Sequence, residues 1–148
     1  MKSTVTLKTK DLCEALSIGR HQLRVWTDTL APYSVQTTKA RSARCYDPAD
    51  LLFFAVIKHI DDVFGLAVQS MARFSNDLYV CIREPQSLTI QPYIFINIVN
   101  NQCERLDLNM SSKEGIIVDI QPAQLRVCQF LGLSPQQSQL QLGLVKVK

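Results

Sequence analysis

The chain carries Gln22-Leu23-Arg24-Val25-Trp26 and, about twenty residues later, Arg44-Cys45-Tyr46-Asp47-Pro48-Ala49-Asp50-Leu51. The first stretch has the pattern of an amphipathic helix, whose polar and apolar side chains lie on opposite faces. The second stretch starts another helix, because Asp47 is a favourable N-cap and proline is favoured at the first helical position. The segment between the two stretches is polar and basic. This order predicts a helix, a solvent-facing hairpin and a further helix.

The helix of the first stretch is expected to run from Arg20 to about Thr29, with Gly19 as its N-cap. Its side chains at positions i, i+1 and i+4, which are Arg20, His21 and Arg24, share one face. Leucine and tryptophan side chains of the same helix turn toward the core. A polar face rich in hydrogen-bond donors is therefore expected on the surface.

The neighbouring segments complete a helix-turn-helix followed by a hairpin, or wing. Thr9 is the expected N-cap of a first helix, which ends near Ser17. The wing has no apolar periodicity, whereas the helix that follows it is apolar enough to be central to a core. The expected elements are a helix over 9–17, a wing over 33–45 with its tip near 37–42, a helix over 47–62 and a helix over 67–77.

Composition and periodicity change near residue 78, where β-branched and aromatic residues become frequent. This favours an α+β fold: an N-terminal winged helix-turn-helix over residues 1–77 and a small β-containing domain with one or two helices over residues 78–148. The glutamine-rich tail is either an edge strand or disordered. In this half we expect strands over 78–82, 93–99 and 116–120, and a helix from Pro122 to about Leu131.

Charge is distributed unevenly along the chain. The net charge is only +3, but residues 20–44 contain five cations and one anion, whereas cations and anions balance from residue 75 onward. Local positive charge favours a nucleic-acid surface, although a solvated basic loop would have the same charge. The five cysteines lack Cys-x-x-Cys spacing, so neither a disulfide framework nor a zinc site is expected. The absence of a secretory signal and of a long apolar run predicts a cytoplasmic protein without a membrane span.

Residues 7 to about 74 resemble the DNA-binding domain of the MerR family of transcription regulators. The family closes its recognition helix with Leu-Arg-x-(Tyr or Trp) and joins its wing to the third helix with Arg-x-Tyr-x-x-x-Asp-Leu. The resemblance implies DNA contacts by Arg24 on the recognition helix and Arg44 on the wing, and a phosphate contact by Tyr46. The full set of expected DNA-binding residues is Arg20, His21, Gln22, Arg24, Lys39, Arg41, Arg44 and Tyr46.

Several of these residues have a structural alternative. Arg24 could pair with Asp28 at i+4 on an exposed helix. Tyr46 could pack its ring against the third helix. His59, inside an apolar helix, is expected to be a core or interface residue, and Trp26 is expected in the core.

The expected function is a sequence-specific transcription regulator that binds an inverted repeat of double-stranded DNA as a homodimer. The long dimerisation helix of the family has no counterpart in the sequence, so assembly into a homodimer or a higher homo-oligomer is assigned to the C-terminal half. One alternative is an architectural DNA-binding protein of the excisionase or packaging type. Another is a ligand-binding or protein-interaction module in the second half. No cofactor, metal or catalytic residue is expected, because no motif for them is present.

Overall fold

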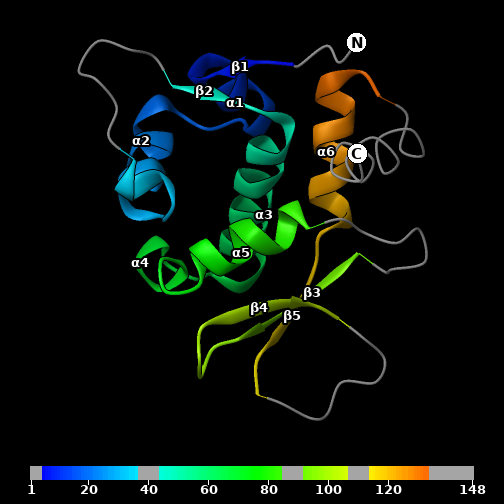
Figure 1. Ribbon diagram of the computed structural model, residues 1–148. Helices are drawn as coiled ribbons and strands as arrows, with labels where there is room; N and C mark the ends of the chain where they lie inside the picture. The colour runs from blue at the N-terminus through cyan, green and yellow to red at the C-terminus, as the bar shows by residue number, and fades with distance from the viewer. Residues whose placement is uncertain (1–4, 37–43, 85–91, 107–113, 134–148) are drawn as a thin grey trace.

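The computed structural model describes residues 5–36, 44–84, 92–106 and 114–133. These residues form a mixed α+β fold with six α-helices, a 3-10 helix and two small antiparallel sheets. The expected α+β class is confirmed. The central element is α3 (Pro48–Phe64), which lies between the helix pair of the N-terminal half and the C-terminal helix (Figure 1).

The first two helices meet across a tight turn. Helix α1 (Thr9–Leu16) has Lys8 as its N-cap, whereas Thr9 was expected in that role, so Thr9 is the first residue of the helix. The Asp11 carboxylate accepts a 2.8 Å hydrogen bond from the Lys8 backbone N–H. Helix α2 (Arg20–Thr29) has the expected bounds and the expected N-cap, Gly19. The turn between the helices uses a left-handed residue, Ser17, with φ 54°.

The segment expected to form the wing has a different structure where it is described. Residues Tyr33–Val35 form the 3-10 helix η1, and Tyr33 is buried. Strand β2 (Cys45–Tyr46) pairs with β1 (Leu7–Lys8), far earlier in the sequence, rather than with residues 33–36. The proposed wing tip at 37–42 lies outside the described residues. The prediction of an entirely solvent-facing segment was wrong for Tyr33, because its ring joins the aromatic core.

Helix α3 has the capping geometry that its sequence predicts. The Asp47 carboxylate accepts from the Asp50 N–H at 2.7 Å, and the Asp50 carboxylate accepts from the Asp47 N–H at 2.9 Å. These reciprocal bonds satisfy two backbone donors that the first turn leaves without helical partners. The helix ends at Gly65, whose φ of 66° is readily adopted by glycine. Every residue from Leu51 to Ile57 is buried, which confirms the central position of this helix.

The region after α3 differs most from expectation. A helix over 67–77 was predicted, but the structure has a single turn, α4 (Val68–Met71), followed by α5 (Ser75–Arg83). The strand predicted over 78–82 is therefore wrong. The side chains of Leu78, Cys81 and Ile82 are buried along one side of α5, so packing at helical spacing overrides β propensity here. The boundary placed between residues 77 and 78 falls inside this helix.

The larger sheet has the strand order β4-β3-β5, with β3 (Tyr93–Asn97) in the centre. Strands β3 and β5 (Ile116–Asp119) were expected, whereas β4 (Gln102–Arg105) was not. Helix α6 (Gln121–Leu131) follows β5 with the expected proline in its first turn, and it ends at Gly132. It packs along α3 and contacts α1, so the two halves of the chain lie against each other (Figure 1).

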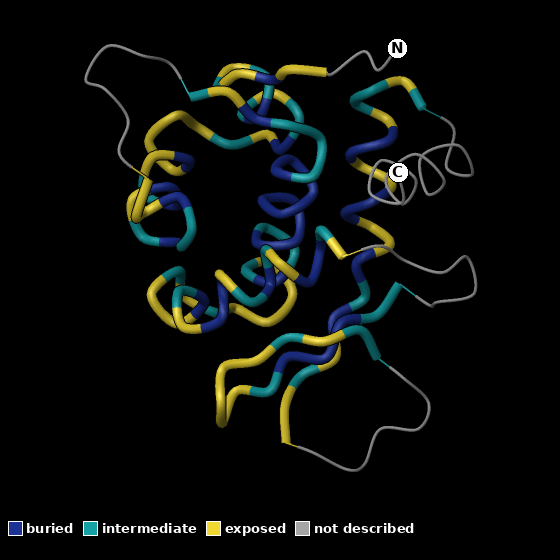
Figure 2. The backbone as a smooth tube through the Cα atoms, viewed as in Figure 1, coloured by how far each residue is buried: buried dark blue, intermediate teal, exposed yellow. Residues whose placement is uncertain are grey.

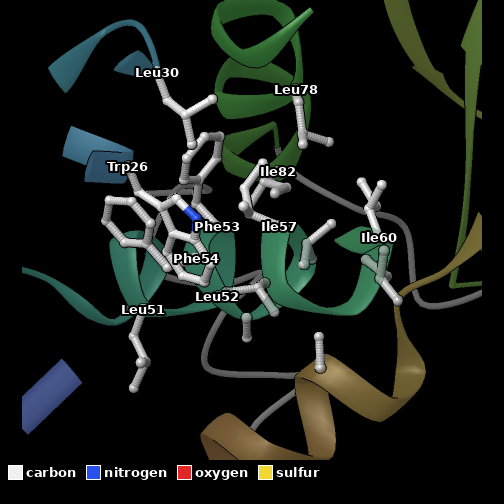
Figure 3. Packing of buried hydrophobic residues seen from close by; sticks show 14 of the residues in the cluster. Trp26, Leu30, Leu51, Leu52, Phe53, Phe54, Ile57, Ile60, Leu78 and Ile82 are labelled. Carbon is white, nitrogen blue, oxygen red and sulfur yellow. The ribbon is translucent and has the colours of Figure 1, made fainter. Parts of the chain in front are cut away.

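A single hydrophobic cluster connects these elements. Figure 2 shows α3 buried along most of its length. The Trp26 ring stacks on Phe54 with ring centroids 6.1 Å apart, and Leu30, Leu78 and Ile82 approach α3 nearby (Figure 3). This confirms the core position of Trp26 and fixes the inner side of α2 against α3.

Candidate nucleic-acid interface

The outer side of α2 presents polar and basic side chains. Arg20, His21, Gln22 and Arg24 are all exposed, whereas Leu23 is buried on the same helix. The division follows the helical period, because the exposed positions lie opposite those that contact the core. The structure thus leaves four of the expected DNA-binding residues exposed on α2.

None of these side chains forms a hydrogen bond or an ion pair within the described parts of the chain. The Arg24 guanidinium forms no ion pair there, including none with Asp28, the alternative considered for it. The Arg24 carbonyl accepts a 3.0 Å bond from the Thr27 hydroxyl, which leaves the guanidinium unaffected. Exposed arginine and glutamine side chains without internal partners can bind an external acceptor without first breaking a bond.

Arg44 is half-buried and has an internal partner. Both terminal nitrogens of its guanidinium lie 3.3 Å from the Tyr33 carbonyl oxygen and donate to it. This contact links the two described ends of the chain on either side of residues 37–43. Lys39 and Arg41, also expected to bind DNA, lie outside the described residues. In the structure Arg44 thus holds strand β2 to Tyr33.

Tyr46 has a packing role, as in the alternative considered for it. Only 4% of its surface is exposed, and its ring meets Phe54 edge-on at 6.1 Å. Burial raises the pKa of its hydroxyl, and this effect is opposed by the Arg44 charge and a hydrogen bond with Thr9. The expectation of a phosphate contact by Tyr46 is corrected, because this residue lies in the core.

His59, which was expected to be a core or interface residue, is half-buried in α3.

An ionic network joins the end of α5 to the first turn of α3, and sequence reasoning missed it. The Arg83 guanidinium, at the end of α5, binds Asp47 at 2.9 and 2.8 Å and Asp50 at 2.8 Å. Asp50 also accepts a 2.5 Å hydrogen bond from the Tyr33 hydroxyl. The two carboxylates were predicted only as helix caps. No local pattern relates them to an arginine more than thirty positions later.

The pKa values of the two carboxyl groups in the ionic network are shifted in opposite directions. Burial raises the pKa of Asp50, and the nearby charge of Asp47 adds to this effect. Burial would also raise the pKa of Asp47, but hydrogen bonds from Arg83 and the Asp50 N–H, together with the Arg83 charge, hold it below its ordinary value. Asp47 is therefore the more acidic of the two. Burial likewise raises the pKa of the Tyr33 hydroxyl, which keeps it protonated as a donor.

Within the described ranges no group of three metal-ligating side chains gathers, and no disulfide joins the five cysteines. None of the helices described has both the length and the apolar character needed to cross a bilayer. The comparisons identify no relative: the chain matches no family model, no curated protein and no solved structure.

Proposed function

We propose that this protein is a sequence-specific DNA-binding regulator of MerR-like type, with α1 and α2 as its helix-turn-helix. The observation that carries the proposal is the exposed surface of α2, where Arg20, His21, Gln22 and Arg24 form no hydrogen bond or ion pair within the described residues. Helix α2 follows α1 after a short turn and is fixed from behind by Leu23 and Trp26. A helix held in this way can insert its outer face into a groove.

The chemistry of this face suits the edges of base pairs. An arginine guanidinium can donate two hydrogen bonds to O6 and N7 of guanine, and glutamine can bind adenine through N6 and N7. Each good pair of this kind discriminates against a wrong base by about 1–3 kcal/mol. Helix α2 has ten residues and is therefore about 15 Å long. With its side chains an α-helix is about 10–12 Å across, so its first turns can enter a major groove about 12 Å wide.

We further propose that two copies associate through the edge of β5 that faces away from β3, which pairs with no other strand within the described residues. The Ile120 N–H bonds to the Pro92 carbonyl in the β3–β5 ladder. Successive residues of an antiparallel strand direct their backbone N–H and C=O groups to opposite sides of the strand. The N–H and C=O groups of Ile117 and Asp119 therefore point away from β3. The Ile117 side chain is 52% exposed. An edge of this composition that no described strand covers is a template for another strand.

A second copy fits this edge by symmetry. In an antiparallel β5–β5 pair centred on Ile117, the two isoleucines face each other, as they would across a two-fold axis. Asp119 then lies opposite Gly115 of the other copy, which keeps the two aspartates apart. A two-fold dimer would present two α2 helices to an inverted repeat.

Fluorescence anisotropy tests the DNA-binding proposal. The purified protein is titrated onto duplex DNA from its own upstream region and onto a scrambled duplex of equal length, across a salt series. We expect tighter binding to the upstream fragment, with affinity that falls steeply as salt rises. Equal and weak binding to both duplexes would contradict sequence specificity and favour an architectural DNA-binding role. No binding at low salt would contradict DNA binding by this surface.

A further inference from the structure

We infer that Arg83 is a positioning residue for DNA binding: it holds the start of α3 and, through Tyr33, the chain that leaves α2. The inference rests on the proposed function, because it assigns a role in binding to a residue that lies outside the α2 face. It concerns a network that the proposed DNA contacts do not use.

Arg83 is held in one orientation by partners on two elements. Both terminal nitrogens of its guanidinium group donate hydrogen bonds to the Asp47 carboxylate, and one of them also donates to the Asp50 carboxylate. Its guanidinium carbon lies 4.4 Å from the centre of the Tyr79 ring, one turn earlier on α5. A planar fork can bind two carboxylates and stack on a ring at once, whereas a lysine ammonium would provide a single point charge. The arrangement fixes the end of α5 to the first turn of α3.

Tyr33 connects the first turn of α3 to the end of α2. The Tyr33 hydroxyl donates to the Asp50 oxygen that also accepts from Arg83. The Tyr33 ring packs against Phe54, with centroids 4.7 Å apart, and Phe54 is the residue on which Trp26 of α2 stacks. The next residue, Ser34, donates a 3.0 Å hydrogen bond from its backbone N–H to the carbonyl of Leu30, the C-cap of α2. Tyr33 thus fixes the last turn of α2 to the ionic network.

Helix α5 extends this connection to the larger sheet. Its Asp77 carboxylate accepts a hydrogen bond from the backbone N–H of Cys103 in β4. One helix therefore contacts the sheet near its beginning and holds the α2–α3 connection at its end. Displacement of Arg83 is expected to change the angle at which α2 meets DNA, even where the protein remains folded.

Two variants test the inference. Arg83→Gln removes the charge and the fork, and Tyr33→Phe keeps the ring and removes only the hydroxyl. Arg73→Gln is the matched control, because Arg73 is exposed and has no ion pair within the described residues. Each protein is first shown to be folded by circular dichroism at the assay temperature. Its Kd for the upstream fragment is then measured by anisotropy at several salt concentrations.

We expect Arg83→Gln and Tyr33→Phe each to raise Kd by roughly fivefold or more, with an unchanged slope of log affinity against log salt. Arg73→Gln should stay within about twofold of the wild type. A lower melting temperature with unchanged Kd in both variants would overturn the inference, because the network would then contribute stability alone. A salt slope reduced by about 0.9 in Arg83→Gln would also overturn it, because that change marks a direct phosphate contact.

The outcomes separate this inference from the proposed function. If Arg83→Gln does not fold, Tyr33→Phe decides, since it retains the salt bridges and the ring packing. A wild-type protein that binds the upstream fragment while both folded variants bind equally well refutes only the positioning role. A wild-type protein that binds no DNA refutes both proposals.

Discussion

At the first turn of α3, two aspartates have opposite electrostatic effects on folding. The pKa of Asp47 is lowered, because bonds from Arg83 and the Asp50 N–H outweigh the effect of burial. Ionised Asp47 therefore stabilises the fold above the pKa of about 3.9 that aspartate has in the unfolded chain. This contribution disappears as the pH falls through the lower folded pKa. Asp50 has the opposite sign: burial raises its pKa, so its contribution is complete below about pH 3.9 and is lost as the pH rises through its folded pKa.

An Asp47→Asn variant removes the contribution of Asp47 and also the charge that helps to raise the pKa of Asp50. The wild type should exceed it in free energy of unfolding above about pH 4, and the difference should shrink as the pH falls further. Urea denaturation between pH 3 and 6 measures both proteins under identical conditions. A difference that stays constant over this range would show that the lowered pKa of Asp47 is not linked to folding.

Single residues were predicted from sequence where their role depends on near neighbours. The Asp47 cap, the Gly19 cap and the inward position of Trp26 follow from spacings of a few residues. Burial of Tyr33 was missed, because its partners come from α3 and α5 and its flanking sequence is polar. Arg83 was missed for the same reason, since it pairs with residues more than thirty positions away.

At the scale of elements, α5 shows how packing determines secondary structure. Leu78-Tyr79-Val80-Cys81-Ile82 has strand-like composition, yet it forms a helix. Its buried residues, Leu78, Cys81 and Ile82, have the i, i+3, i+4 spacing that lets a helix cover α3. A run of five apolar residues fits either period, so the sequence alone could not decide between them. The strands at 93–97 and 116–119 and the helix α6 were predicted, because turn residues or proline bound them.

Helix α3 offers a matched pair of phenylalanines for testing the core. Phe54 is fully buried, whereas Phe64, at the end of the same helix, is 39% exposed. Phe54→Ala should lower the free energy of unfolding by about 3–5 kcal/mol, because it removes the ring on which Trp26 and Tyr33 pack. Phe64→Ala should change it by about 0.5 kcal/mol or less. Equal losses in urea denaturation would contradict the central position of Phe54.

At the scale of the whole molecule, the two halves share one hydrophobic cluster. It includes Leu12 of α1, Ile60 of α3, Ile94 of β3 and Val127 of α6. The Arg126 guanidinium of α6 also donates to the Leu16 carbonyl at the end of α1, 3.2 Å away. The change in composition near residue 78 indicated a second unit, but it carried no information about how that unit packs on the first. Contacts between distant segments determine that arrangement.

The proposed dimer makes a prediction at this scale. Ile117→Lys should convert a dimer into a monomer, because it places like charges opposite each other at the centre of the β5–β5 pair. Val80→Lys is the control, since Val80 is 48% exposed on α5, away from the β5 edge. Analytical ultracentrifugation gives the mass of each protein. If both variants are monomers, or if both remain dimers, the interface does not lie at β5.

The exposed face of α2 is tested most directly by comparing Arg24→Ala with Arg73→Ala. Both substitutions remove one exposed arginine, and neither breaks an ion pair within the described residues. If Arg24 contacts a base, Arg24→Ala should weaken binding to the upstream fragment by about 1–3 kcal/mol in anisotropy titrations. It should also lower the ratio of the affinity for the upstream fragment to the affinity for scrambled DNA. Arg73→Ala should leave both quantities nearly unchanged. Equal effects of the two substitutions would show that general positive charge, rather than the α2 face, binds DNA.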